Sequence, residues 1–218
     1  MSDYFFQEHT KDLDLNKCWD AHAHILGVGD SNSNIYLHKP TGLMGLLNPL
    51  RIELFKRVLG LPKEDTDKSY LEKMANTAKN CFEGYRVLSF AFSPYYENNE
   101  PKVELSDFII PNKWSLDASK KFHELIYVTS INPHDVNAIE KLHIAINDGA
   151  VALKWLPCAH NINPADKSLI PFYNELAKLN FPVITHAGGE KAVKGNHFRQ
   201  DYGNPLHLRI PLEQGVKV

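Results

Sequence analysis

The fold prediction starts from residues 125–156, which read LIYVTSINPHDVNAIEKLHIAINDGAVALKWL. The first seven and the last seven residues of this stretch are mostly apolar, as in strands that are buried on both faces. Between them, Ile139, Leu142 and Ile146 recur at helical spacing, and Gly149 is a typical residue just after a helix end. A helix between two apolar strands predicts a parallel βαβ unit.

The same rhythm continues on both sides of this stretch. Further strand patterns lie at 19–26, 86–92 and 181–186, and polar residues follow the carboxyl ends of several strands. In a barrel of parallel strands these ends face one mouth, where the active site collects. The sequence therefore favours a TIM-type (β/α)₈ barrel over the alternative, a doubly wound open sheet. Residues 28–85 interrupt the rhythm and predict a helical insertion after the first strand.

Composition narrows the class of protein. The 218-residue chain is 43% hydrophobic and 23% charged, which is ordinary for a globular protein with one sizeable core. Its net charge of −2 predicts no nucleic-acid partner and no anionic membrane partner. Cys18, Cys81 and Cys158 are odd in number and widely spaced, which favours a reducing compartment. Because no signal-peptide pattern or spanning apolar run is present, the expected location is the cytoplasm.

The motif Asp20-Ala21-His22-Ala23-His24 carries the chemistry of the first strand. Side chains alternate along a strand, so His22 and His24 point the same way and can grip one divalent cation. The alternative is that the two imidazoles only pack or form hydrogen bonds. His186 ends the strand at 181–186 and would face the same barrel mouth, so the sequence predicts a catalytic metal held by three histidines.

Asn132 and Glu190 are predicted substrate-binding residues. Asn132 follows the strand at 125–131, where helix capping is the alternative role. Glu190 stands four residues after His186, where an ordinary loop carboxylate is the alternative. Asp20 either orients the HxH strand as a partner of the imidazoles or caps the strand in polar contact with the base of a neighbouring strand.

These motifs resemble the amidohydrolase superfamily. The segments 20–24 and 185–188 (DAHAH and THAG) are similar to its first and fifth strands, and the resemblance extends over 18–218, with the insertion matching loosely. Four further segments resemble the amidohydrolase-related branch, which contains metal-dependent hydrolases and decarboxylases: ALKWLP at 152–157, INP at 162–164, PFY at 171–173 and GNPL at 203–206.

The resemblance implies one partial barrel domain over 1–218 with one or two divalent metal ions at the strand ends. His22, His24 and His186 fall on the ligand positions of the family, and zinc is the expected metal, with manganese or iron as alternatives. Lys154 falls where some members carry a carboxylated lysine that bridges two metals. The favoured role here is an unmodified, buried lysine that pairs with a carboxylate or with a small-molecule substrate.

The chain departs from the family at its C-terminal end. Members of this branch have another histidine after strand six and an aspartate after strand eight, which acts as general base. Here 216–218 would only begin strand six, so the barrel is expected to be incomplete. Three explanations stay open: a truncated chain, closure with a second copy or another chain, and a stable partial barrel without activity.

Two functional hypotheses follow. In the first, the chain is a metal-dependent hydrolase that cleaves a C–N, ester or lactone bond of a small molecule, or performs a related non-oxidative decarboxylation. In the second, it is a catalytically incomplete interaction module. A TatD-type deoxyribonuclease shares the HxH motif but would have a glutamate near Lys154, and the low net charge does not suit a phosphate backbone.

Overall fold

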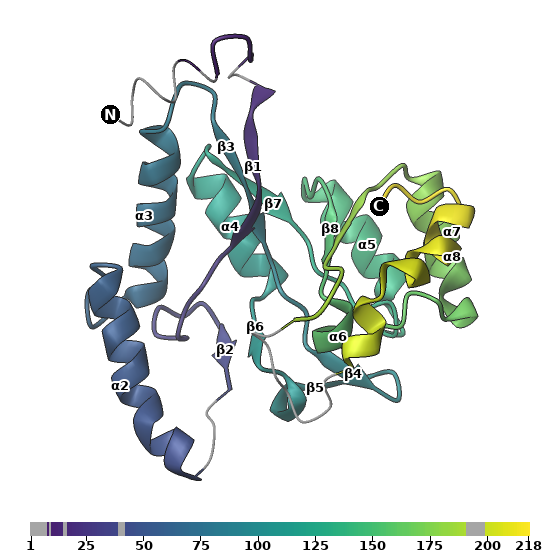
Figure 1. Cartoon of the computed structure of the whole chain (residues 1–218), viewed down its shortest axis with the longest axis horizontal. Helices are drawn as coiled ribbons and strands as arrows, with labels where there is room; N and C mark the ends of the chain where they lie inside the picture. The colour runs from purple at the N-terminus through teal and green to yellow at the C-terminus, as the bar shows by residue number, and fades with distance from the viewer. Residues whose placement is uncertain (1–7, 9, 15–16, 39–41, 191–198) are drawn as a thin grey trace.

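The computed structural model describes residues 8, 10–14, 17–38, 42–190 and 199–218, with the side chains of 42–48 and 51 excluded. Figure 1 shows α2 (Gly42–Val58) and α3 (Thr66–Lys79) along one side of strands β1 and β3, and the C-terminal helices at the opposite end of the molecule. The strands that carry the predicted site residues lie between these two groups of helices.

Five strands of the predicted rhythm are present. The ranges are β1 (Trp19–His24), β3 (Arg86–Phe90), β7 (Leu125–Val128), β8 (Leu153–Trp155) and β9 (Val183–Thr185). β1, β3 and β7 form a three-stranded parallel sheet in that order, and β8 and β9 form a two-stranded parallel sheet. The parallel direction follows from the helices between the strands, since a crossover returns the chain to the same end.

The expected TIM-type barrel is wrong. The described strands form separate small sheets of two or three strands, and the two parallel sheets are joined by the isolated bridge between Thr129 and Leu153. Alternating strands and helices determine the direction of neighbouring strands, but they do not determine how many strands pair into one sheet. Residues 216–218, expected to begin a sixth strand, form none, although Val183 N donates to Lys217 O at 2.8 Å.

Two short antiparallel pairs complete the sheets. β2 (Tyr36–Leu37) pairs with β6 (Phe108–Ile109), and β4 (Tyr95–Glu97) pairs with β5 (Glu100–Lys102). The β4–β5 turn places Asn98 and Asn99 at positive φ, which asparagine tolerates better than most residues. These pairs belong to the connections after β1 and β3 and had no counterpart in the sequence prediction.

The remaining helices cover the strands. They are η2 (Val103–Leu105), α4 (Asn112–Lys121), α5 (Ala138–Asn147), α6 (Pro157–His160), η3 (Lys167–Leu169), α7 (Ile170–Lys178), η4 (Gln200–Gly203), η5 (Pro205–Leu208) and α8 (Arg209–Glu213). α5 ends as the sequence predicts, because Gly149 takes a φ of +96° just beyond its end. α4 packs on β3 and β7, while α5 and α7 pack on one another.

The largest core cluster joins β8, β9, α5 and α7. Trp155, Tyr173, Leu142 and Leu153 are among its fully buried side chains. A second cluster packs α3 and α4 against β1 and β3, with Leu71 and Val87 in its interior. Packing on both sides therefore holds the ends of β1 and β9, from which the candidate histidines project.

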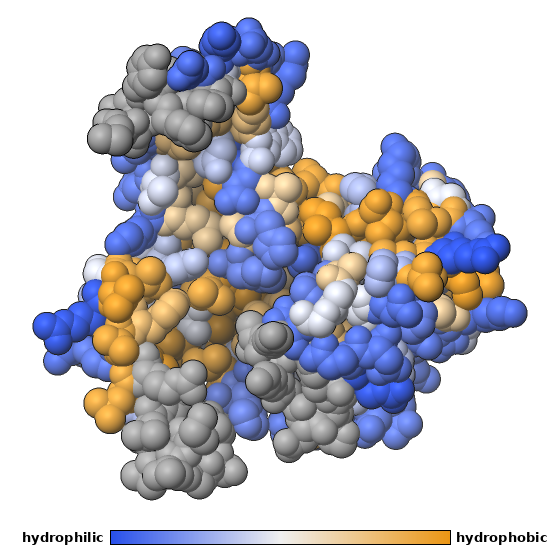
Figure 2. Space-filling view, in the orientation of Figure 1, coloured by the Kyte–Doolittle hydropathy of each residue, from blue (hydrophilic) through white to orange (hydrophobic). Residues whose placement is uncertain are grey.

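β1 and α2 keep much apolar surface. β1 is more exposed than the short buried strand that its sequence predicts, because Trp19 is 50% exposed and His22 is also exposed. On α2, Leu50, Leu54 and Val58 lie one turn apart and are exposed, and Figure 2 shows this hydrophobic strip along the edge of the molecule.

Candidate metal and substrate site

His22 and His24 lie side by side, as strand alternation predicts. Their Nε2 atoms are 3.2 Å apart, and both rings rest against the buried ring of Phe90, with centroid distances of 5.4 and 5.3 Å. Phe90 comes from the neighbouring strand β3, where His24 is its register partner. The sequence prediction missed Phe90. The signal was present, because Phe90 is an aromatic residue within the apolar pattern at 86–92.

Both imidazoles are held in the neutral form. Burial, with help from the Lys154 ammonium, lowers the pKa of His24 to about 4. Burial and Lys154 also lower the pKa of His22, against the opposing effect of Asp20. Neutral imidazoles have a free lone pair, which is the form that binds metal ions.

His186 lies just after β9, with its backbone N–H donating to Trp155 O at 3.1 Å. Its Nε2 is buried and has no hydrogen-bond partner in the described part of the chain, while its Nδ1 lies 3.7 Å from Glu190 Oε2. Proximity to His186 contributes to the lowered pKa of His22, so the three histidines share one region. Glu190 is therefore placed to orient the His186 ring.

The histidine pair fits a divalent ion. Two nitrogens that each lie about 2.0–2.1 Å from a tetrahedral zinc are separated by about 3.3–3.4 Å, close to the separation of these two Nε2 atoms. A hydrogen bond between the imidazoles explains the same distance. Within the described parts of the chain, no group of three or more His, Cys, Asp or Glu side chains is arranged as a metal site. His22 and His24 are thus close enough to share one ion, whereas His186 lies in the same region but does not form a three-residue metal site with them.

Lys154 is the central residue of β8 and is buried. Its Nζ lies 4.7 Å from the centroid of the same Phe90 ring that supports the two imidazoles. Burial lowers the pKa of Lys154 to about 8, and the Glu190 carboxylate partly opposes this shift. The structure therefore places five of the six predicted site residues in one region. His22, His24 and Lys154 lie against Phe90, and His186 and Glu190 follow β9.

The side chain of Asn132 forms hydrogen bonds within the protein. Its side-chain amide donates to His160 O at 2.7 Å and accepts from His134 N at 3.0 Å, and the residue is buried. These bonds connect the turn after β7 to the end of α6. A substrate contact by Asn132 stays a prediction, and its geometry supports the structural role instead.

His160, the last residue of α6, is a further buried histidine of this region. Its Nδ1 accepts from Leu156 N at 3.2 Å, which leaves the proton of the neutral ring on Nε2, and this atom has no hydrogen-bond partner among the described residues. Burial, with smaller effects from Lys154 and His24, lowers its pKa to about 3. The ring packs on Phe92 at a centroid distance of 4.4 Å.

The loop that leaves the histidine pair is anchored by Asp67 at the start of α3. Its buried carboxylate accepts hydrogen bonds from Val28 N at 2.6 Å, Gly29 N at 3.0 Å and Ser33 Oγ at 2.5 Å. A side chain at Gly27 would collide with this carboxylate, since a Cβ there would lie 2.6 Å from Asp67 Oδ1. The helical insertion thus positions the loop after β1.

The loop after His186 is held in a similar way. Gly188, at a φ of +98°, donates its N–H to Gly203 O at 2.7 Å, and a Cβ on Gly203 would overlap the Gly188 carbonyl. The glycine in the GNPL segment is therefore required by close backbone contact.

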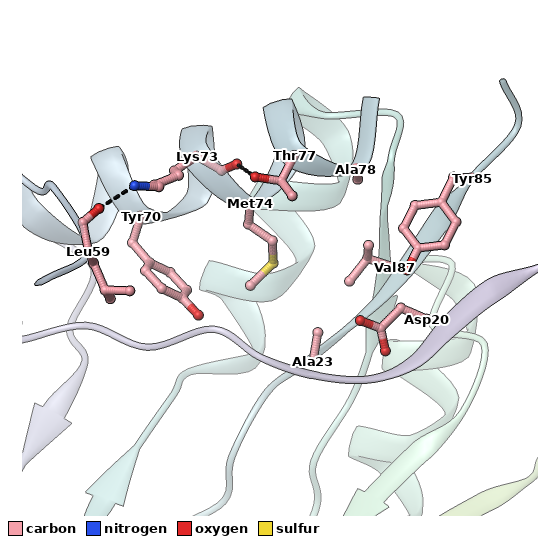
Figure 3. A pocket seen from close by; sticks show the side chains of 10 residues that line it. All are labelled: Asp20, Ala23, Leu59, Tyr70, Lys73, Met74, Thr77, Ala78, Tyr85 and Val87. Atoms are coloured by element: carbon pink, nitrogen blue, oxygen red, sulfur yellow. Dashed lines mark hydrogen bonds between the residues drawn. The ribbon is translucent and has the colours of Figure 1, made fainter. Parts of the chain in front are cut away.

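Asp20 faces away from the imidazoles. Its carboxylate accepts from His22 N at 2.9 Å, and a register irregularity between Asp20 and Ala23 turns both residues toward α3. Figure 3 shows them lining a pocket of about 300 Å³ with Met74, Tyr85 and other residues. None of the three histidines lines this pocket, and the hydrogen bond that Asp20 accepts is a local one within β1. Its role as a partner of the imidazoles stays a prediction.

Comparisons with known proteins do not assign a family. No protein-family profile and no curated protein matches the chain. Among solved structures, it is similar to a probable 2-pyrone-4,6-dicarboxylic acid hydrolase from Acinetobacter baumannii, crystallised with citric acid bound. The identity is 15% and the TM-score 0.42, and the match covers 78% of this chain and 49% of that one. The chain thus spans about half the length of that protein, and a similarity this low supports no argument about function.

The helices give one further result on partners. Of those that the structure describes, none has the length and apolar composition needed to cross a bilayer.

Proposed function

We propose that this chain carries the metal-binding part of a hydrolase site, with His22, His24 and His186 as ligands of one divalent ion, zinc first. The observation that supports it is the 3.2 Å separation of His22 Nε2 and His24 Nε2. In the same region the buried Nε2 of His186 has no hydrogen-bond partner among the described residues. A buried ring nitrogen without a partner costs about 1–3 kcal/mol, which a bound ion would remove.

A divalent ion at such a site supplies Lewis acidity toward a carbonyl group and makes water nucleophilic at neutral pH. The chain's own residues have separate roles. The neutral imidazoles offer lone pairs, and Glu190, at 3.7 Å from His186 Nδ1, restrains the orientation of that ring. Lys154 is a substrate contact. The proposed reaction is cleavage of a C–N, ester or lactone bond, with non-oxidative decarboxylation as the related variant.

Zinc binding tests the proposal directly. The metal-free chain is dialysed against zinc, and its zinc content and affinity are measured for the unmodified chain, His22→Ala and His186→Ala. We expect one equivalent of zinc in the unmodified chain and at least about tenfold weaker binding in each variant. Hydrolysis of p-nitrophenyl acetate is followed in the same samples.

His143→Ala is the matched control, because His143 lies on α5 and pairs with Glu175 at 3.0 Å. This variant should bind zinc as the unmodified chain does. A folded chain that binds no zinc would refute the proposal and favour the interaction module, with the two imidazoles joined by a hydrogen bond.

A further inference from the structure

Lys154 is a buried cation with no anionic partner among the residues that the structure describes. It is 1% exposed, and among the described residues its Nζ makes no hydrogen bond and no ion pair. Its Nζ lies over the face of the Phe90 ring, 4.7 Å from the ring centroid. Buried ammonium groups are almost always paired, because the loss of hydration is not recovered otherwise. A cation–π contact recovers only about 2 kcal/mol of that loss.

The neighbouring carboxylate of Glu190 does not form an ion pair with Lys154. Glu190 attracts Lys154 electrostatically, but its Oε2 lies 3.7 Å from His186 Nδ1. The other ionisable neighbours that act on Lys154 or are affected by it are the imidazoles of His22, His24 and His160. Neutral imidazoles do not balance a positive charge. The Lys154 ammonium is therefore available to form an ion pair with a bound anion.

The position of Lys154 places that group beside the candidate metal ligands. Its Nζ and the rings of His22 and His24 all lie against Phe90. An anion that pairs with Nζ would therefore be anchored next to the imidazoles. One ammonium with a carboxylate nearby suits a monoanion better than a phosphate dianion, because the second negative charge would face Glu190 without a cation of its own.

We propose that Lys154 is a specificity-determining residue that selects small organic substrates bearing a carboxylate group. This inference rests on the proposed function for its reaction, but recognition of the carboxylate can be measured without turnover. The site would accept carboxylic acids as substrates in preference to the corresponding neutral amides.

The experiment compares benzoate with benzamide, which have nearly the same shape and differ in charge. Binding is measured by ligand-observed NMR in zinc and, separately, in EDTA. We expect benzoate to bind at least about tenfold more tightly than benzamide, because a hydrogen bond to an ionised group is the stronger kind. The preference should disappear in Lys154→Met and remain in Lys178→Met, which removes an exposed lysine on α7.

Several results would overturn the inference: equal binding of the two probes, a preference that survives in Lys154→Met, or tighter binding of inorganic phosphate. A carboxyl adduct on Lys154, seen as added mass, would also do so, because it reverses the charge. If Lys154→Met does not fold, the ¹³Cε signal of Lys154 in the unmodified chain must shift with benzoate and not with benzamide. Zinc binding without a benzoate preference refutes this inference alone, whereas a benzoate preference without zinc binding refutes only the proposed function.

Discussion

The carboxylate of Asp67 accepts a 2.6 Å hydrogen bond from the backbone N–H of Val28 and so joins the start of α3 to the loop that leaves His24. The two residues are 39 positions apart in the chain. Through this contact, the helical insertion holds the exit of the strand that carries the histidine pair.

Asp67→Ala should destabilise the fold by about 2–4 kcal/mol, because it leaves the donors of Val28, Gly29 and Ser33 without their acceptor. Urea unfolding measures the loss. Asp117→Ala is the control, since Asp117 forms an exposed ion pair with Lys113 on α4 and should cost less than about 1 kcal/mol. Equal losses in the two variants would contradict the role of Asp67.

Gly203→Ala should destabilise the chain by about 1–3 kcal/mol and weaken zinc binding, because the new methyl group overlaps the Gly188 carbonyl in the loop after His186. Gly189→Ala is the matched change in the same loop. Its Cβ would meet Gln200 Oε1 at an ordinary 3.6 Å, so little change is expected. Thermal unfolding and zinc titration of both variants check the difference, and a tolerated alanine at position 203 would argue against the close contact.

Stability should fall as the pH drops below about 6.5, and His160 should account for part of this fall. The unfolded chain binds a proton at a histidine near pH 6.5, whereas the folded chain holds His160 neutral down to about pH 3. Between these values the unfolded state binds more protons, so stability decreases with acidification by up to about 1.4 kcal/mol per pH unit for this residue.

Urea unfolding from pH 7 to pH 4 measures that slope, and His160→Gln should reduce it. The ring signals of His160 in NMR give an independent measurement, because they should stay at their neutral positions throughout this range. Titration of those signals near pH 6.5 would be inconsistent with a buried neutral imidazole.

Trp155→Phe should cost about 2–4 kcal/mol. The indole N–H of this buried residue donates to Ile131 O at 2.8 Å, so phenylalanine leaves that carbonyl unsatisfied and a cavity in the core. Trp19→Phe, at an exposed position of β1, is the control and should change stability by less than about 0.5 kcal/mol. Chemical unfolding of the two variants followed by circular dichroism makes the comparison.

Local patterns in the sequence predicted the local structure well. The five strands were predicted close to their observed positions, because apolar runs with polar or glycine ends are a local property. Strand alternation also placed His22 and His24 on the same side of β1. The sheet was predicted wrongly, since pairing between strands depends on contacts among residues far apart in the chain.

The sequence by itself determined which side chains are available for the proposed chemistry: a histidine pair on one strand, His186 after another, and a lysine within an apolar run. Only the tertiary structure decided their surroundings. It placed Phe90 beneath the two imidazoles, gave the Asn132 amide internal partners and buried the Lys154 ammonium with no anionic partner among the described residues. Residue type limits what a side chain can bind. Only folding determines its burial and its neighbours, and these decide whether its charge or hydrogen-bonding groups have partners.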